Sequence, residues 1–328
     1  MNVGTSKFSA KGSVVAPPSK SLAHRLLIAA ALKKGRTVVK NIGYSADVTR
    51  TCDCLAALGA KITVENGNAV VYGIQNSAAN DFFGEKDFIL NTGESGSTLR
   101  FLMPVAAALG IRAEFICDSG LLCRPIDEMI NVLSAHGEKI EKTNRGYLLS
   151  GKIHPGKYVI DGTVSSQFAS GLAFALPLLS GESTLEITGK LSSESYFDMT
   201  LNVLGQSVIK FKKIGYKSII FNKSDYCLPD ETVVPGDFSS AAFMLALGAL
   251  GGWVLTQLEK LFNSNTNRLN MTIAFVFLTS ALAMAEFKIG PVTIGFSSLL
   301  TCMMLGTLFC NLCPLSGEIM EKSDRWTS

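Results

Sequence analysis

The residues best suited to chemistry in this sequence are cations at the start of an apolar helix. The apolar run is Leu26–Leu32, and it follows the residues Pro17-Pro18-Ser19-Lys20-Ser21-Leu22-Ala23-His24-Arg25. Pro18 cannot lie inside a helix, so the pattern predicts a helix that begins near Ser19 and closes at Gly35. Lys20, Ser21 and Arg25 then share the first turns with free backbone N–H groups, where the helix dipole favours an anion. We therefore expect a site for phosphate or carboxylate, with a merely solvated helix start as the alternative.

Four further helix starts carry similar residues, and they are Glu94–Arg100, Cys123–Asp127, Val164–Phe168 and Ser192–Tyr196. In the first of them Gly96 would let an anion approach the backbone, while the Glu94 carboxylate opposes an anion and is expected to pair with Arg100. In the second, Arg124 stands before a proline that is expected to be the first helical residue. A single serine pair is more often a cap than a ligand, but five such starts favour one shared polyanionic ligand.

Composition narrows the class of protein. The chain has 328 residues, enough for two domains, and its formal net charge of +3 comes from dispersed lysines and arginines. This distribution argues against a nucleic-acid partner. Eight scattered cysteines without a secretory signal indicate the cytoplasm, and three histidines make a histidine-rich metal centre improbable. Cys310 and Cys313 have CxxC spacing, but no second ligand pair accompanies them, so no metal or redox site is expected there.

An internal repeat organises residues 19–222. Three segments each contain a helix end, a strand, a turn and a strand, and they are Leu55–Gly73, Val132–Gly151 and Val203–Asn222. The turns are expected at Asn66-Gly67 and at Gly215. Each hairpin follows an amphipathic helix, expected at 47–58, 125–135 and 196–204. Each amphipathic helix follows a strand (37–41, 112–117, 183–188), and each strand follows an apolar helix that begins near Ser19, Ser95 or Ser165. Threefold repetition of one α/β unit would bring the three apolar helix starts to a common face.

Six motifs in this order resemble those of the 5-enolpyruvylshikimate-3-phosphate synthases, or 3-phosphoshikimate 1-carboxyvinyltransferases. They begin at Pro18-Ser19-Lys20-Ser21 and continue through Gly93–Arg100, Arg124-Pro125-Ile126, Ser165–Phe168, Ser193–Asp198 and Gly236–Ala242. The resemblance covers residues 5–251. It implies the α/β enolpyruvyl transferase fold, in which each domain is a threefold repeat of βαβαββ units.

The resemblance also implies roles for single residues. Lys20 is similar to a lysine that contacts both substrates and assists proton transfer. Shikimate-3-phosphate would be bound by Ser21, Arg25, Ser165, Ser166, Ser193 and Tyr196. Phosphoenolpyruvate would be bound by Gly96 and Arg124, and Gln167 would reach both substrates. Ser97 and Arg100 would shape the phosphoenolpyruvate loop.

The implied reaction transfers the enolpyruvyl group of phosphoenolpyruvate to the 5-hydroxyl of shikimate-3-phosphate and releases phosphate, in aromatic amino acid biosynthesis. It requires cationic and N–H donors and a general acid or base, and it calls for no metal and no organic cofactor. The alternative within the fold is UDP-N-acetylglucosamine enolpyruvyl transferase, which carries a reactive cysteine. Cys117 and Cys123 lie in the corresponding region, but Ser21 and the run Ser165-Ser166-Gln167 favour shikimate-3-phosphate.

The expected domains are 1–18 as first strand and hinge, 19–235 as the substrate-binding repeat domain, and 236–252 as the start of a truncated second domain. Residues 253–328 are expected to be an unmatched apolar helical tail. Its apolar parts, 271–285 and 289–312, approach or reach the length of a bilayer, so a transporter-like membrane segment is predicted there. Three alternatives follow: a working enzyme completed by residues from elsewhere, an inactive shikimate-3-phosphate-binding remnant, and a part of a membrane transporter.

Overall fold

The computed structural model describes residues 15–74, 87–246, 286–289 and 292–295. The chain divides into two compact units, of which one is residues 15–238. The other comprises residues 1–14 and 239–328. In the second unit the strands β13 (Glu286–Ile289) and β14 (Val292–Gly295) pair antiparallel, and the helix α8 (Phe238–Ala246) begins at the boundary. The prediction of an apolar helical tail is therefore wrong for these eight residues, whose backbone is extended.

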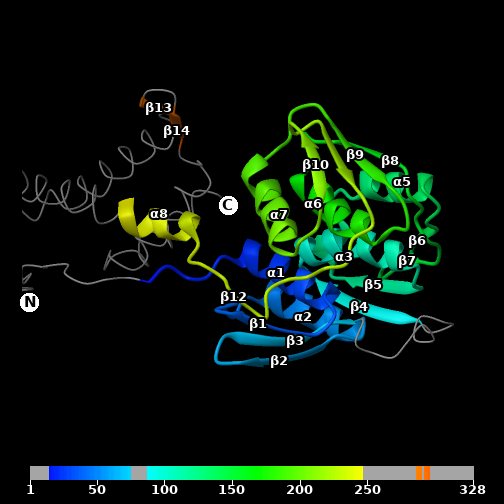
Figure 1. Cartoon of the computed structure of the whole chain (residues 1–328), viewed down its shortest axis with the longest axis horizontal. Helices are drawn as coiled ribbons and strands as arrows, with labels where there is room; N and C mark the ends of the chain where they lie inside the picture. Colours follow the sequence, from blue (N-terminus) through cyan, green and yellow to red (C-terminus); the bar gives the residue numbers. More distant parts are fainter. Residues whose placement is uncertain (1–14, 75–86, 247–285, 290–291, 296–328) are drawn as a thin grey trace, which may run out of the picture. The chain divides into compact units, whose positions relative to one another are not determined.

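The first unit is a mixed α/β fold built from three sheets of the same design (Figure 1). Each sheet has four strands, of which the first two are parallel and the others antiparallel. The strand orders are β12-β1-β3-β2, β4-β5-β7-β6 and β8-β9-β11-β10. The strands are β1 (Arg36–Lys40), β2 (Lys61–Glu65), β3 (Asn68–Tyr72), β4 (Phe88–Gly93), β5 (Ala113–Cys117), β6 (Ile140–Lys142), β7 (Gly146–Leu149), β8 (Lys157–Asp161), β9 (Ser183–Thr188), β10 (Phe211–Ile214), β11 (Ser218–Phe221) and β12 (Glu231–Val233).

The predicted hairpins and helices are confirmed. The helices are α1 (Lys20–Leu32), α2 (Ala46–Ala57), α3 (Gly96–Leu109), α4 (Ser119–Leu122), α5 (Asp127–Ala135), α6 (Ser166–Ala175) and α7 (Glu194–Gln206), with a 3-10 turn at Leu176–Leu178. Asn66 and Gly67 have positive φ angles of 50° and 74°, which their two-residue hairpin turn requires. Gly215, with φ 58°, begins the three-residue turn between β10 and β11. The expectation that Pro125 is the first residue of its helix is wrong, because α5 begins at Asp127.

Each sheet begins with a strand that the repeat pattern did not include. In the first sheet this strand is β12, which comes from the far end of the unit and pairs parallel with β1, opposite Val38, Val39 and Lys40. The two ends of the unit also meet, since the Ser19 amide donates to the Pro235 carbonyl at 3.0 Å. The pairing of β1 with β12 therefore joins the two ends of the unit.

Three apolar helices form the interior of the unit (Figure 1). Nearly every residue of α1, α3 and α6 is buried, so these helices are covered on all sides. α3 packs against α6, and α1 packs against α2 and α7. Rigid burial of the helix bodies fixes the positions of their first residues, which include most of the predicted site residues.

Candidate active site

Two arginines flank the first residue of α3. A Cβ placed on Gly96 would lie 3.3 Å from Nη1 of Arg124 and 3.6 Å from Nη1 of Arg100. Both guanidinium groups therefore approach the backbone at Gly96, where the N-terminal end of α3 also favours an anion. Burial lowers the pKa of Arg100, and the neighbouring Arg124 charge lowers it further. Two cations held this close favour an anion between them.

The start of α6 joins this pair. Arg100 donates from Nη1 to Gln167 Oε1 at 2.7 Å, and Gln167 donates from Nε2 to Ser97 Oγ at 3.0 Å. Ser165 caps α6 by accepting the Gln167 amide at 3.2 Å. The structure thus brings together Gly96, Arg124, Ser165 and Gln167, which the sequence placed in three separate motifs. Arg100 is the residue that links them, a position more central than the sequence indicated.

Glu94 does not pair with Arg100 as expected. Its carboxylate accepts the Gly120 amide at 3.0 Å and lies 3.8 Å from Arg124 Nη2, with both side chains about half exposed. Arg100 is occupied instead by Gln167 and by the Pro125 carbonyl at 3.1 Å. An exposed pair at this distance is weak, so an incoming anion could replace Glu94 at Arg124.

Lys20 and Ser21 lie at the start of α1, where Lys20 remains partly exposed. Its Nζ lies 2.7 Å from Asp47 Oδ2, in the first turn of α2. Asp47 was not singled out from the sequence, and only its place at a helix start could have indicated it. The ammonium group is therefore held at the surface by one carboxylate.

Arg25 is buried, with only 2% of its surface exposed. Its guanidinium donates to Thr200 Oγ1 at 2.7 Å, to the Ser21 carbonyl at 2.6 Å and to the Tyr196 carbonyl at 2.8 Å. It also lies over the Phe101 ring at 4.9 Å. Burial lowers the pKa of Arg25 to about 10. Arg25 thus joins α1 to the start of α7, beneath the surface where Lys20 and Ser21 lie.

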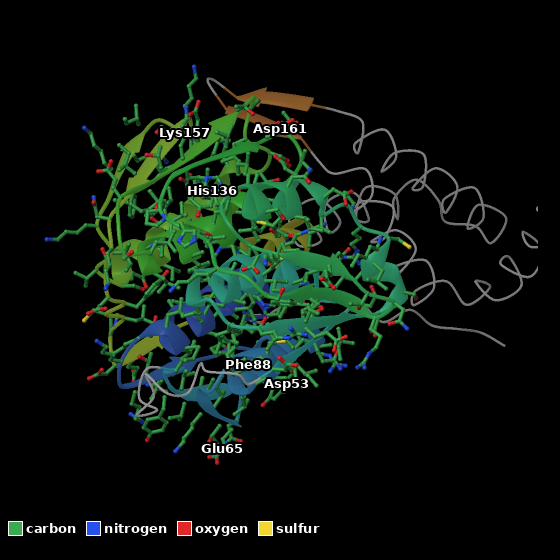
Figure 2. The ribbon with its side chains drawn as sticks, turned by 90° about the vertical axis from the view of Figure 1, so that its right-hand side faces the viewer. Asp53, Glu65, Phe88, His136, Lys157 and Asp161 are labelled. Carbon is green, nitrogen blue, oxygen red and sulfur yellow. The ribbon has the colours of Figure 1, made fainter. Side chains whose placement is uncertain are left out.

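Ser193 and Tyr196 lie at the start of α7, and both are exposed. Ser193 has φ 56° and ψ 54°, a left-handed conformation that is strained for a residue with a side chain. Ser166, by contrast, is 6% exposed in the first turn of α6. Asp161 lies at the end of β8, just before the loop that leads to α6 (Figure 2). Its amide donates a hydrogen bond to the Glu128 carboxylate.

Cys117 and Cys123, the two cysteines expected near the site, differ in exposure. Cys117 is buried, and burial raises the pKa of its thiol, so the reactive thiolate of the alternative transferase is not favoured there. Cys123 is exposed beside Arg124. Within residues 15–74 and 87–246 and the two tail strands, no three His, Cys, Asp or Glu side chains gather as a metal site. Cys310 and Cys313 lie outside the described residues.

Comparison with known proteins decides the family. The family model of EPSP synthase (3-phosphoshikimate 1-carboxyvinyltransferase) matches residues 6–285. This chain belongs to the EPSP synthase family. The EPSP synthase match extends 33 residues beyond Gly252, so the expectation that the resemblance ends there is wrong. The comparisons do not support a transporter-like tail.

Curated relatives of the EPSP synthase family are similar to about three quarters of the chain. The 3-phosphoshikimate 1-carboxyvinyltransferase of Clostridium kluyveri is 39% identical over 245 residues, which are 74% of this chain and 56% of that protein. The one from Clostridium beijerinckii is 38% identical over 245 residues, with 73% and 56% covered. The chain therefore spans about half the length of the curated relatives it matches.

Solved EPSP synthase structures share the fold. EPSP synthase from Acinetobacter baumannii superposes with a TM-score of 0.61 at 23% identity, covering 73% of this chain and 53% of that one. The enolpyruvyl transferase NikO from Streptomyces tendae gives a TM-score of 0.52 at 15% identity, covering 73% and 55%. Among the described residues, no helix has the length and apolar character to cross a bilayer. Most of 271–312 lies outside them.

Substituting Gly96 by alanine tests the pair of arginines. The new methyl group would occupy the space between Arg100 and Arg124, 3.3 Å from the nearer nitrogen. We expect the affinity for inorganic phosphate to fall at least tenfold, about 1.4 kcal/mol. The free energy of unfolding should change by less than about 1 kcal/mol, because Gly96 is the first residue of α3 and the nearest nitrogens belong to flexible arginine side chains. Calorimetric titration and urea unfolding measure the two effects, and an unchanged affinity would show that the anion binds elsewhere.

Proposed function

We propose that this chain binds shikimate-3-phosphate and phosphoenolpyruvate as an enolpyruvyl transferase of aromatic amino acid biosynthesis. In this proposal Gly96 and Arg124 bind phosphoenolpyruvate. Shikimate-3-phosphate is bound by Ser21, Arg25, Ser165, Ser166, Ser193 and Tyr196, while Lys20 and Gln167 meet both substrates. The site needs no metal or organic cofactor, and the chain acts in the cytoplasm. Residues 19–235 provide the substrate domain. The first strand and hinge expected at 1–18 and the start of the second domain expected at 236–252 lie partly outside the described residues.

The observation that carries the proposal is the hydrogen bond between Arg100 and Gln167, beside Gly96 and Arg124. This hydrogen bond joins the starts of α3 and α6. Two cations, Arg100 and Arg124, therefore lie beside the N–H and O–H donors of these two helix starts. An addition–elimination reaction between two phosphorylated substrates needs such donors, because negative charge is present on both phosphates and on the carboxylate.

The proposed reaction has two steps. The 5-hydroxyl of shikimate-3-phosphate loses its proton to a general base, and its oxygen forms a bond to C2 of phosphoenolpyruvate while the C2–C3 double bond opens and C3 gains a proton. A proton is then lost from C3, the bond between C2 and the phosphate oxygen breaks, and phosphate leaves. Arg124 would hold the phosphoenolpyruvate anion as a fork, and Lys20 would assist the proton transfer.

The second candidate is a chain that binds shikimate-3-phosphate without catalysing the transfer. A phosphate-release assay with both substrates, together with calorimetric titration of each, separates the candidates. Turnover supports the transferase, binding without turnover supports the remnant, and no binding of either substrate contradicts both. UDP-N-acetylglucosamine in place of shikimate-3-phosphate tests the related transferase.

Substituting Arg25 by methionine is expected to weaken both substrate binding and stability. In the part of the chain that the structure describes, this buried guanidinium donates to neutral oxygens, and methionine would leave them without that donor. We expect the free energy of unfolding to fall by about 2 kcal/mol and the affinity for shikimate-3-phosphate to fall about 100-fold at temperatures where the variant is folded.

The exposed Arg145, in the turn between β6 and β7, provides the matched control. Arg145→Met removes the same charge and should change neither the affinity nor the stability. If Arg25→Met keeps its affinity within twofold, Arg25 acts only as a structural connection between α1 and α7.

A further inference from the structure

A buried chain of side-chain contacts joins α1, α2 and α3 beneath Lys20. His24 Nδ1 lies 2.7 Å from Thr51 Oγ1, and Thr51 Oγ1 lies 2.7 Å from Thr98 Oγ1. Thr98 Oγ1 in turn lies 2.7 Å from Ser95 Oγ, at the cap of α3. None of the four residues is more than 1% exposed. These contacts therefore connect the first two turns of three helices without direct access to solvent.

The middle of this chain also contacts Asp47. The hydroxyl oxygens of Thr51 and Thr98 each lie 3.4 Å from the Asp47 backbone carbonyl oxygen. The Asp47 carboxylate holds the Lys20 ammonium at 2.7 Å. The backbone that carries this carboxylate is therefore fixed from its own helix and from α3.

The buried and exposed contacts between α1 and α2 have the same register. His24 lies one turn after Lys20, and Thr51 lies one turn after Asp47, so both pairs are separated by 27 residues. The exposed ion pair by itself is weak, because solvent screens it and both side chains lose freedom. The contact between His24 and Thr51 is shielded from solvent, so it determines where the ion pair between Lys20 and Asp47 can form.

A purely structural contact at this place would be better made by apolar side chains. His24 Nε2 is buried and meets no partner within the described residues. Burying an unpaired polar nitrogen costs free energy that a leucine or valine would not. The polar groups are therefore better explained by the precise position that hydrogen bonds impose.

We propose that His24, Thr51, Thr98 and Ser95 are positioning residues that place Lys20 through Asp47. This inference rests on the proposed function, in which Lys20 meets both substrates. The contact between His24 and Thr51 sets the register of α1 on α2. The contacts of Thr98 and Ser95 fix that pair to α3. Lys20 then extends from a fixed backbone toward the ligand.

Thr51→Val tests the inference, because it keeps the shape of the side chain and removes the hydroxyl group. We expect the affinity of the full chain for shikimate-3-phosphate to fall about tenfold, or about 1.4 kcal/mol. Thr51→Ser, which keeps the hydroxyl, should remain within twofold of the unsubstituted chain. Thr37→Val is the matched control, since Thr37 is fully buried in β1 and its Oγ1 meets no partner among the described residues. It should leave the affinity unchanged.

A double substitution tests whether the effect passes through Asp47. In an Asp47→Asn background, Thr51→Val should change the affinity by less than twofold. A full tenfold loss in that background, or an equal loss in Thr51→Ser, would overturn the inference.

Hydrogen exchange separates this inference from the proposed function. If the unsubstituted chain binds no shikimate-3-phosphate, the proposed function fails, but the amides of residues 49–52 still report on α2. In Thr51→Val they should exchange about tenfold faster, and in Thr37→Val they should not change. Equal exchange rates in the unsubstituted chain and Thr51→Val would overturn the positioning role.

Discussion

Substituting Gly171 by alanine is expected to lower the free energy of unfolding by about 3 kcal/mol. A Cβ at this position would lie 2.2 Å from the Arg100 backbone carbonyl oxygen and 2.9 Å from Pro104 Cγ. The first distance is to backbone inside α3, so no side-chain rotation relieves it. Either α6 moves away from α3 or the chain fails to fold.

The same substitution should also damage the candidate site. α3 carries Gly96 and Arg100 in its first turns, and α6 carries Gln167 in its first turn. Separating the two helices would lengthen the 2.7 Å bond between Arg100 and Gln167. We therefore expect weaker binding of both substrates at temperatures where the variant is still folded, measured by calorimetric titration.

Gly205→Ala is the matched control for Gly171→Ala. Gly205 lies near the end of α7, and a Cβ there would meet nothing within 4 Å. Alanine should stabilise this helix by about 0.5–1 kcal/mol. Urea unfolding measures both variants. A loss of less than 1 kcal/mol in Gly171→Ala would show that α3 and α6 can separate without cost.

Acidification from pH 7 to pH 4 is expected to remove about 3 kcal/mol of folding stability through His24 alone. Burial lowers the pKa of this imidazole from 6.5 to about 4, although the facing Asp47 raises it, and Lys20 and Arg25 lower it further. Below pH 6.5 the His24 imidazole binds a proton in the unfolded chain, whereas in the folded chain it stays neutral until about pH 4. The contribution is therefore complete above pH 6.5 and is lost as the pH falls through this window.

His24→Asn isolates this contribution, because asparagine keeps a polar atom near the position of Nδ1 but does not titrate. Urea unfolding of both chains between pH 8 and pH 4 gives the difference in their free energies of unfolding. That difference should be constant above pH 7 and should shrink by about 3 kcal/mol toward pH 4. Parallel curves over the whole range would show that His24 is not held neutral by the fold.

Local patterns in the sequence predicted the repeated unit. Apolar runs begin at serines, hairpins turn at Asn66-Gly67 and Gly215, and these signals depend only on neighbouring residues. They therefore located α1, α3 and α6 and their starts. The first strand of each sheet was not in this pattern, and β12 in particular is only Glu231-Thr232-Val233, too short and too exposed for a periodic signal.

The sequence by itself determined the repeated α/β design and the cationic residues at its helix starts, because periodicity and capping act over one or two turns. Only the tertiary structure decided that Glu94 pairs with Arg124, that Arg100 bonds to Gln167, and that Arg25 is buried. The contacts of Arg100 and Arg25 join residues from different repeats, up to 175 positions apart in the case of Arg25 and Thr200. Their partners are selected by the packing of α1, α3, α6 and α7, which no local pattern encodes.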